Sequence, residues 1–136
     1  MVDERRIRRL LQRIANDTGF LAEHGATAAP HDEVLLSAVK YRFITAIEGC
    51  IDVAQHLCAS EGWGPPEDNG HALRILGLRG VLARDLADSL VRAVGFRNVL
   101  VHEYAEVDDE RVLAQLGRLD ELRAFIGAVA TWLDAA

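Results

Sequence analysis

The sequence is poor in cysteine and proline, and it contains no long apolar run. Its two cysteines, Cys50 and Cys58, lie eight residues apart in one expected helix, about 12 Å along the axis. That separation is too large for a disulfide between them, so both are expected to be reduced, half-buried thiols of the core. With only three prolines and no low-complexity tract, the chain reads as globular rather than disordered. No apolar run approaches the roughly 18–20 residues of a membrane span.

An excess of positive charge is also missing. The 136 residues carry a formal net charge of −6, which argues against broad, nonspecific binding of nucleic acid through a basic surface. Any anionic substrate would have to meet a local cluster of arginines. The N-terminus lacks the apolar segment of a signal peptide, which favours a cytoplasmic protein. The length suits a single domain over residues 1–136.

Apolar residues recur three and four positions apart along most of the chain, which predicts helices. The expected helices cover residues 3–24, 32–61, 69–78, 83–104 and 108–133, with Asp32 and Asp108 as N-caps of the second and last. No segment alternates strictly as a strand does. The pattern therefore predicts an all-α fold, an up-and-down bundle of four-helix type with one additional short helix.

Glycine and proline mark the expected breaks between these helices. A linker of small residues is predicted from Gly25 to Pro30, and residues 62–66, Gly-Trp-Gly-Pro-Pro, form the clearest break in the chain. Gly80 indicates a further turn. Gly95 is expected to weaken or kink the helix in which it lies.

The run Arg-Asn-Val-Leu-Val-His-Glu-Tyr at residues 97–104 concentrates the chemistry of the chain. At about 100° per residue, one side of the expected helix carries Arg97, Asn98, His102 and Tyr104, and the other side is apolar. Arginine supplies a permanent charge with a forked set of donors, and histidine as a residue type titrates near neutral pH. These are parts of a site that handles phosphate. The alternative is the ordinary solvated face of an amphipathic helix.

Two other charged patterns are open to a functional or an ordinary interpretation. Glu48, Asp52 and His56 form an i, i+4, i+8 stripe on the second helix. This stripe is either a polar patch facing the Arg97 run, with Glu48 and Asp52 lining a cleft, or a solvated and salt-bridged surface. Five arginines surround the apolar stripe of the first helix, and we interpret them as a solvated face with acidic neighbours elsewhere.

Several short blocks, in order along the chain, carry a resemblance to a known family. They are Ala46-Ile47-Glu48, residues 51–56 (Ile-Asp-Val-Ala-Gln-His), Glu61-Gly62-Trp63, Pro66-Glu67-Asp68, Leu76-Gly77, Gly80-Val81-Leu82 and residues 95–104. The last block matches an Arg-x4-His-x-Tyr motif without departure. In order and spacing, the blocks resemble the HepT-like toxins of the HEPN superfamily of helical ribonucleases.

The resemblance implies a metal-independent endoribonuclease without a cofactor, acting as the toxin of a toxin–antitoxin pair. Its implied partners are an RNA substrate, a second copy of the chain that brings two motifs together across a cleft, and a cognate nucleotidyltransferase antitoxin that AMPylates Tyr104. Arg97 and His102 would be the catalytic residues. Asn98 would support them by orienting the imidazole or holding a phosphate, unless it is a simple polar surface residue.

The chemistry fits these residue types. Cleavage of RNA by attack of its own 2′-OH needs proton transfer, which an imidazole provides, and stabilisation of a developing dianion, which a guanidinium provides. The sequence also leaves two rivals, a non-catalytic HEPN-type module that binds a nucleotide or a protein, and a structural helical dimer whose motif is a buried polar network. The RNA target and any base preference stay open.

Overall fold

Every regular element of the structure, a computed structural model that describes residues 1–27 and 32–135, is helical. The elements are α1 (Glu4–His24), η1 (Gly25–Thr27), α2 (Glu33–Ser60), α3 (Asn69–Leu78), α4 (Arg84–His102), α5 (Asp109–Ala114), η2 (Gln115–Arg118) and α6 (Leu119–Ala135), where η marks a 3₁₀ helix. The predicted all-α fold is therefore confirmed.

Aspartates start four of the helices. The side chains of Asp3, Asp32, Asp68 and Asp108 each accept a hydrogen bond from a backbone N–H two or three residues further on, at 2.7–3.1 Å. Such a bond satisfies one of the N–H groups that a helix start leaves without a partner. The two N-caps predicted from the sequence, Asp32 and Asp108, are confirmed.

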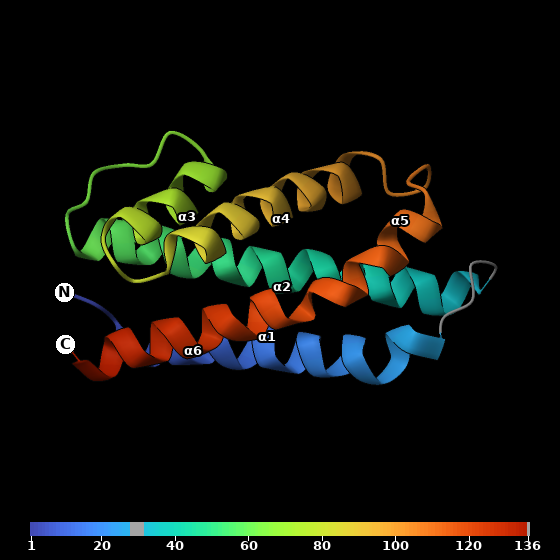
Figure 1. Cartoon of the computed structure of the whole chain (residues 1–136), viewed down its shortest axis with the longest axis horizontal. Helices are drawn as coiled ribbons and strands as arrows, with labels where there is room; N and C mark the ends of the chain where they lie inside the picture. Colours follow the sequence, from blue (N-terminus) through green and yellow to red (C-terminus); the bar gives the residue numbers. More distant parts are fainter. Residues whose placement is uncertain (28–31, 136) are drawn as a thin grey trace.

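Helix α2 is the central element of the bundle. It packs against α1, α3, α4 and α6, and its 28 residues span about 42 Å. Figure 1 shows α3 and α4 on one side of α2 and α1 and α6 on the other, with the four long helices alternating in direction and both termini at one end. The up-and-down arrangement with a short extra helix, α3, is as predicted.

One continuous apolar core joins these helices. Phe43 of α2 and Phe96 of α4 meet edge to face in it, with ring centroids 5.6 Å apart. Two glycines allow helices to approach closely. A Cβ on Gly49 would lie 2.7 Å from Ile14 of α1, and a Cβ on Gly77 would lie 2.7 Å from the Cβ of Ala87 in α4. Cys50 and Cys58 are free thiols, as predicted, but each is only 1% exposed, so they are buried rather than half-buried.

The structure can be compared with the predictions at three places: the last helix, Gly95 and the linker that begins at Gly25. The expected final helix is interrupted, because η2 separates α5 from α6; Leu116 of η2 packs so closely over Gly25 that a Cβ there would lie 2.5 Å from Leu116 Cδ2. Gly95, which was predicted to weaken or kink its helix, lies inside α4, which is continuous from Arg84 to His102. In the predicted linker, Gly25–Thr27 forms η1, and residues 28–30 lie outside the described residues.

No helix in the described part of the chain is long and apolar enough to cross a membrane.

Candidate active site

The last turns of α4 present the predicted motif. Phe96 and Leu100 are buried, four residues apart, and fix which side of the helix faces the core. Arg97 is half-buried beside them, whereas Asn98 and His102 lie on the exposed side, also four residues apart. Burial of the apolar stripe therefore turns the polar residues of the motif toward solvent.

Tyr104 does not continue this helical face, which corrects the prediction that the helix carries it on the Arg97 side. The backbone leaves the helical conformation at Glu103, with φ −127° and ψ 33°. The carbonyl oxygen of Glu103 then accepts hydrogen bonds from the N–H groups of Glu106 and Val107, both at 2.9 Å. Tyr104 thus lies in a turn between α4 and α5. Because helical periodicity ends with the helix, it could not place a residue beyond it.

The guanidinium of Arg97 is held on two sides. Its Nη2 donates to Oε1 of Glu48 on α2 at 2.9 Å, and its Nη1 donates to Oδ1 of Asn98 at 2.9 Å. Its Nε is buried and has no hydrogen-bond partner among the described residues. A guanidinium has five N–H donors, so one donor on each Nη is left for a ligand.

His102 sits at the last residue of α4 with its side chain exposed. Its imidazole makes no hydrogen bond or ion pair with any residue that the structure describes. The amide of Asn98 engages Arg97 rather than this imidazole. The imidazole, one helical turn from Asn98, is therefore accessible to a ligand or to solvent.

Lys40 is a part of the site that the sequence reasoning missed. This lysine of α2 is only 7% exposed, and its Nζ donates to the backbone carbonyl of Tyr104 at 3.1 Å. The same Nζ lies 3.3 Å from Asp109 Oδ1 and 5.1 Å from the centroid of the Tyr104 ring. The hydroxyl of Tyr104 donates to the carbonyl of Ser37 at 3.1 Å. Together these contacts tie the Tyr104 turn to the first part of α2.

A signal for Lys40 was present in the sequence. It stands at helical spacing among Leu36, Phe43 and Ile47, on the face of α2 that the apolar pattern buries. A lysine there needs partners for its charge, and the turn after α4 supplies them.

The predicted stripe on α2 does not act as one unit. Glu48 contacts Arg97, as described above. Asp52, one turn further on, is exposed and makes no hydrogen bond or ion pair with the described residues. His56 accepts a hydrogen bond from the N–H of Asp3 at 3.0 Å and so belongs to the packing of the N-terminus. The structure brings only Glu48 to the motif.

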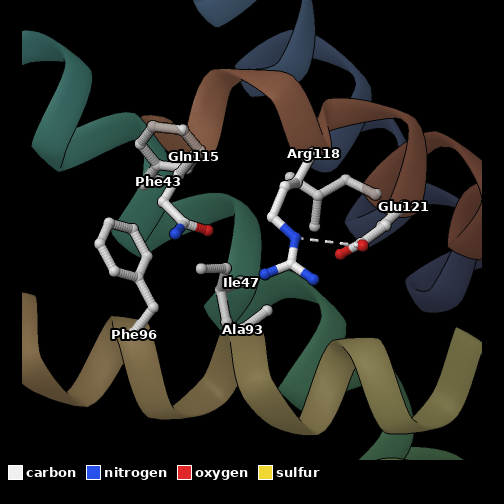
Figure 2. A pocket seen from close by; sticks show the side chains of 8 residues that line it. Phe43, Ile47, Ala93, Phe96, Gln115, Arg118 and Glu121 are labelled. Atoms are coloured by element: carbon white, nitrogen blue, oxygen red, sulfur yellow. Dashed lines mark hydrogen bonds and ion pairs between the residues drawn. The ribbon is translucent and has the colours of Figure 1, made fainter. Parts of the chain in front are cut away.

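Asn98, His102 and Tyr104 are exposed, so these three side chains of the motif are open to solvent. A small pocket lies between α2, α4, η2 and α6 (Figure 2). It is lined by apolar side chains together with Gln115, Arg118 and Glu121. Arg118 Nε lies 3.3 Å from Glu121 Oε1. The volume of the pocket that the centre of a water molecule can reach is about 20 Å³. This is enough for about one water and too small for a nucleotide. Among the described residues no group of three or more His, Cys, Asp or Glu is arranged to hold a metal ion.

Comparison with known proteins adds a family to this geometry. A family model described as Ribonuclease HepT-like matches residues 5–129. The mRNA nuclease HepT of Shewanella oneidensis is 26% identical over 124 residues, which cover 90% of each chain.

Two solved structures share the fold. A tri-AMPylated HEPN toxin of Shewanella oneidensis in complex with an MNT antitoxin superposes with a TM-score of 0.71 at 25% identity, covering 92% of this chain and 91% of that one. YutE of Bacillus subtilis, a cytosolic protein of unknown function, has a TM-score of 0.89 at 17% identity, covering 98% and 92%.

Proposed function

Because the chain belongs to the HepT-like ribonuclease family, we propose that it is the endoribonuclease toxin of a toxin–antitoxin pair, with Arg97 and His102 as its catalytic residues. The observation that carries this proposal is the exposed end of α4, where an unengaged imidazole lies five residues from a guanidinium that keeps donors free. The reaction class is transesterification at the RNA backbone. In it the 2′-oxygen attacks the adjacent phosphorus, the bond to the 5′-oxygen breaks, and a 2′,3′-cyclic phosphate forms.

Each residue has a defined part in that reaction. The imidazole of His102 takes the proton of the 2′-OH or gives a proton to the leaving 5′-oxygen. The free Nη donors of Arg97 bind the non-bridging oxygens, where negative charge increases in the transition state. Glu48 and Asn98 orient the guanidinium through the two hydrogen bonds already described. Because the nucleophile belongs to the RNA itself, this route needs neither a metal nor a cofactor.

We further propose that the active unit is a homodimer. One imidazole does not easily serve as both base and acid in a single cleavage, and a two-fold axis beside α4 supplies a second His102 and a second Arg97. The surface there contains exposed apolar side chains, Val101 at 43% and Tyr104 at 38%, which a dimer contact could cover. Doubling the local charge also helps an acidic protein bind RNA.

The regulation that we propose is AMPylation of Tyr104 by a nucleotidyltransferase antitoxin. The phenolic oxygen attacks the α-phosphorus of ATP, pyrophosphate leaves, and the phenolic proton passes to a base or to solvent. The product no longer has a hydroxyl to donate to Ser37, so the bond seen at 3.1 Å is lost and the added phosphate meets a carbonyl oxygen there. The modified side chain must therefore leave α2, carrying a bulky anion into the neighbourhood of Arg97 and His102.

For the whole chain, we propose one domain over residues 1–136 acting in the cytoplasm, where an RNA substrate is present. Asp52 is retained only as a residue that could line the cleft of a dimer.

The experiment that tests the function is induced expression in a bacterial host, with growth and total RNA integrity followed together. The parent chain should stop growth and fragment RNA, and His102→Ala should do neither. His24→Ala, which removes an exposed histidine of α1, is the matched control and should behave as the parent does. If His102→Ala fragments RNA as fast as the parent while staying folded, the assignment of His102 is wrong.

The alternative function is a non-catalytic HEPN-type module that binds a nucleotide or a protein. It would be favoured if purified parent protein and His102→Ala both left RNA intact. A buried structural network is not favoured, because His102 is exposed; its replacement should change the melting temperature by less than about 2 °C.

A further inference from the structure

The exposed side of α1 concentrates positive charge in a protein that is acidic overall. Five of the fifteen basic residues of the chain lie within positions 5–13, and all five side chains are exposed, opposite the buried apolar stripe of the helix. The α1 arginine face consists of Arg5, Arg6, Arg8, Arg9 and Arg13. Three of them repeat every four residues, about 6 Å apart along the axis.

The fold neutralises little of this charge. Arg8 pairs with Glu4 at 2.9 Å and with Asp134 at 2.8 Å, and these partners raise its pKa. The side chains of the other four arginines make no ion pair or hydrogen bond with any residue that the structure describes. The expectation of acidic neighbours is therefore met for Arg8 alone.

The arrangement is also unfavourable for the helix itself. Arg5 and Arg6 stand in the first turn, where the positive end of the helix dipole disfavours cations. The i, i+4 pairs of Arg5 with Arg9 and of Arg9 with Arg13 are like-charged, and such pairs destabilise a helix. Because the fold provides no compensating ion pair for these residues, the charge is better explained by a ligand.

The composition of the face limits what that ligand is. A second copy related by a two-fold axis through this face would bring arginine against arginine, which excludes a symmetric self-contact there. Hot spots of protein interfaces combine arginine with tryptophan and tyrosine, and none of the exposed large hydrophobic side chains of the described chain lies on α1. A face rich in guanidinium groups and without apolar anchors is typical of contacts with nucleic-acid phosphates.

We propose that the α1 arginine face is a second RNA-binding surface, which holds the phosphate backbone of the substrate at a distance from the cleavage site. The proposal rests on the proposed function in one respect, that RNA is the polyanion. Figure 1 shows α1 on the opposite side of α2 from α4, so only an RNA long enough to reach around the molecule engages both surfaces. Short substrates should bind and be cleaved without help from α1.

The test measures binding separately from cleavage. A fluorescent single-stranded RNA of about 30 nucleotides is titrated against His102→Ala protein at salt concentrations from 50 to 200 mM. The same measurement is made with the additional replacements Arg5→Gln, Arg9→Gln and Arg13→Gln, since glutamine keeps helix propensity. The matched control replaces Arg74, Arg79 and Arg84, three exposed arginines outside α1, with glutamine, so that net charge falls equally.

Loss of three phosphate contacts should reduce the salt slope of the binding constant by about 2, since each contact to a single strand contributes about 0.7. The plots of the logarithm of the binding constant against the logarithm of salt concentration, for the α1 triple and its parent, should meet near 1 M salt. The affinity of the α1 triple at 0.1 M salt should therefore be roughly 100-fold lower than that of its parent. The control triple should keep the parent slope. Cleavage by the His102-containing α1 triple should fall for the long RNA and stay unchanged for a dinucleotide.

Other outcomes overturn the proposal. Equal salt slopes for the α1 triple and its parent, or equal losses for the α1 and control triples, would show that the face holds no phosphates in particular. Normal RNA binding with loss of the antitoxin complex would make the face a protein-docking surface instead. If the parent protein binds no RNA, the proposal fails, while fragmentation of RNA by the active chain still decides the proposed function independently. The triple should melt no lower than its parent, because the replacements relieve repulsion.

Discussion

Replacing Glu48 tests how the site holds Arg97, the arginine that we propose takes part in cleavage. The bond from Arg97 Nη2 to Glu48 Oε1 is 2.9 Å long, with side chains 22% and 36% exposed. A charged hydrogen bond contributes about 1.5–3 kcal/mol when well shielded, and the exposure of Glu48 reduces that to about 1–2 kcal/mol. Glu48→Ala should therefore lower the free energy of unfolding by about that amount.

The effect on cleavage follows from the same figure. If the whole 1–2 kcal/mol serves to orient the guanidinium toward the transition state, kcat should fall about 5–30-fold, without a rise in KM. Glu48→Gln keeps an acceptor oxygen at the same place and should recover part of the loss. Glu33→Ala, which removes an exposed carboxylate at the start of α2 without a contact to Arg97, is the matched control and should stay within about twofold of the parent.

The assay is steady-state cleavage of a fluorescence-quenched RNA, with urea unfolding of each variant in parallel. Faster cleavage by Glu48→Ala than by the parent would refute the reasoning, because it would mean that the carboxylate competes with RNA for Arg97. An equal loss from Glu33→Ala would refute it as well, since the effect would then come from the general charge of α2.

Three further predictions concern helix packing, the turn after α4 and the buried cysteines. Gly95→Ala should raise the free energy of unfolding by about 0.5–1 kcal/mol, because a Cβ there meets nothing within 4 Å. Gly77→Ala should lower it by about 1–3 kcal/mol, because the new Cβ would lie 2.7 Å from the Cβ of Ala87 in α4. Thermal melts of the two variants and the parent test both predictions. Lys40→Met should lower the free energy of unfolding by about 1–2 kcal/mol, because the hydrogen bond to the Tyr104 carbonyl is lost. Limited proteolysis should then cut the turn after α4 faster than in the parent. An unchanged rate of cutting would mean that this lysine does not hold the turn. Burial raises the pKa of the Cys50 and Cys58 thiols, so iodoacetamide should modify neither in folded protein at pH 8. As pH rises past the reference thiol pKa of 9.0, the unfolded chain ionises and the folded chain does not, so stability should fall there; rapid alkylation at pH 8 would contradict the burial.

Local chemistry explains why so much of this protein was predictable. Helix positions follow from apolar periodicity, and Asp32 and Asp108 mark helix starts because an aspartate side chain caps backbone N–H groups within three residues of itself. The motif from Arg97 to Tyr104 was found in the same way, because its residue types and spacing are properties of one short stretch of chain. The family match over residues 5–129 agrees with the resemblance inferred from the sequence blocks.

The sequence by itself thus determined the helices, their caps, the all-α class and the family. Tertiary structure decided that Glu48, and not Asp52, meets Arg97 and that α4 ends at His102. It also decided that Lys40 contacts the Tyr104 turn and that Leu116 packs over Gly25. Each of these depends on how two helices are rotated and offset against one another. That relation is set by the packing of side chains distant in sequence, which a periodic pattern along one segment does not contain.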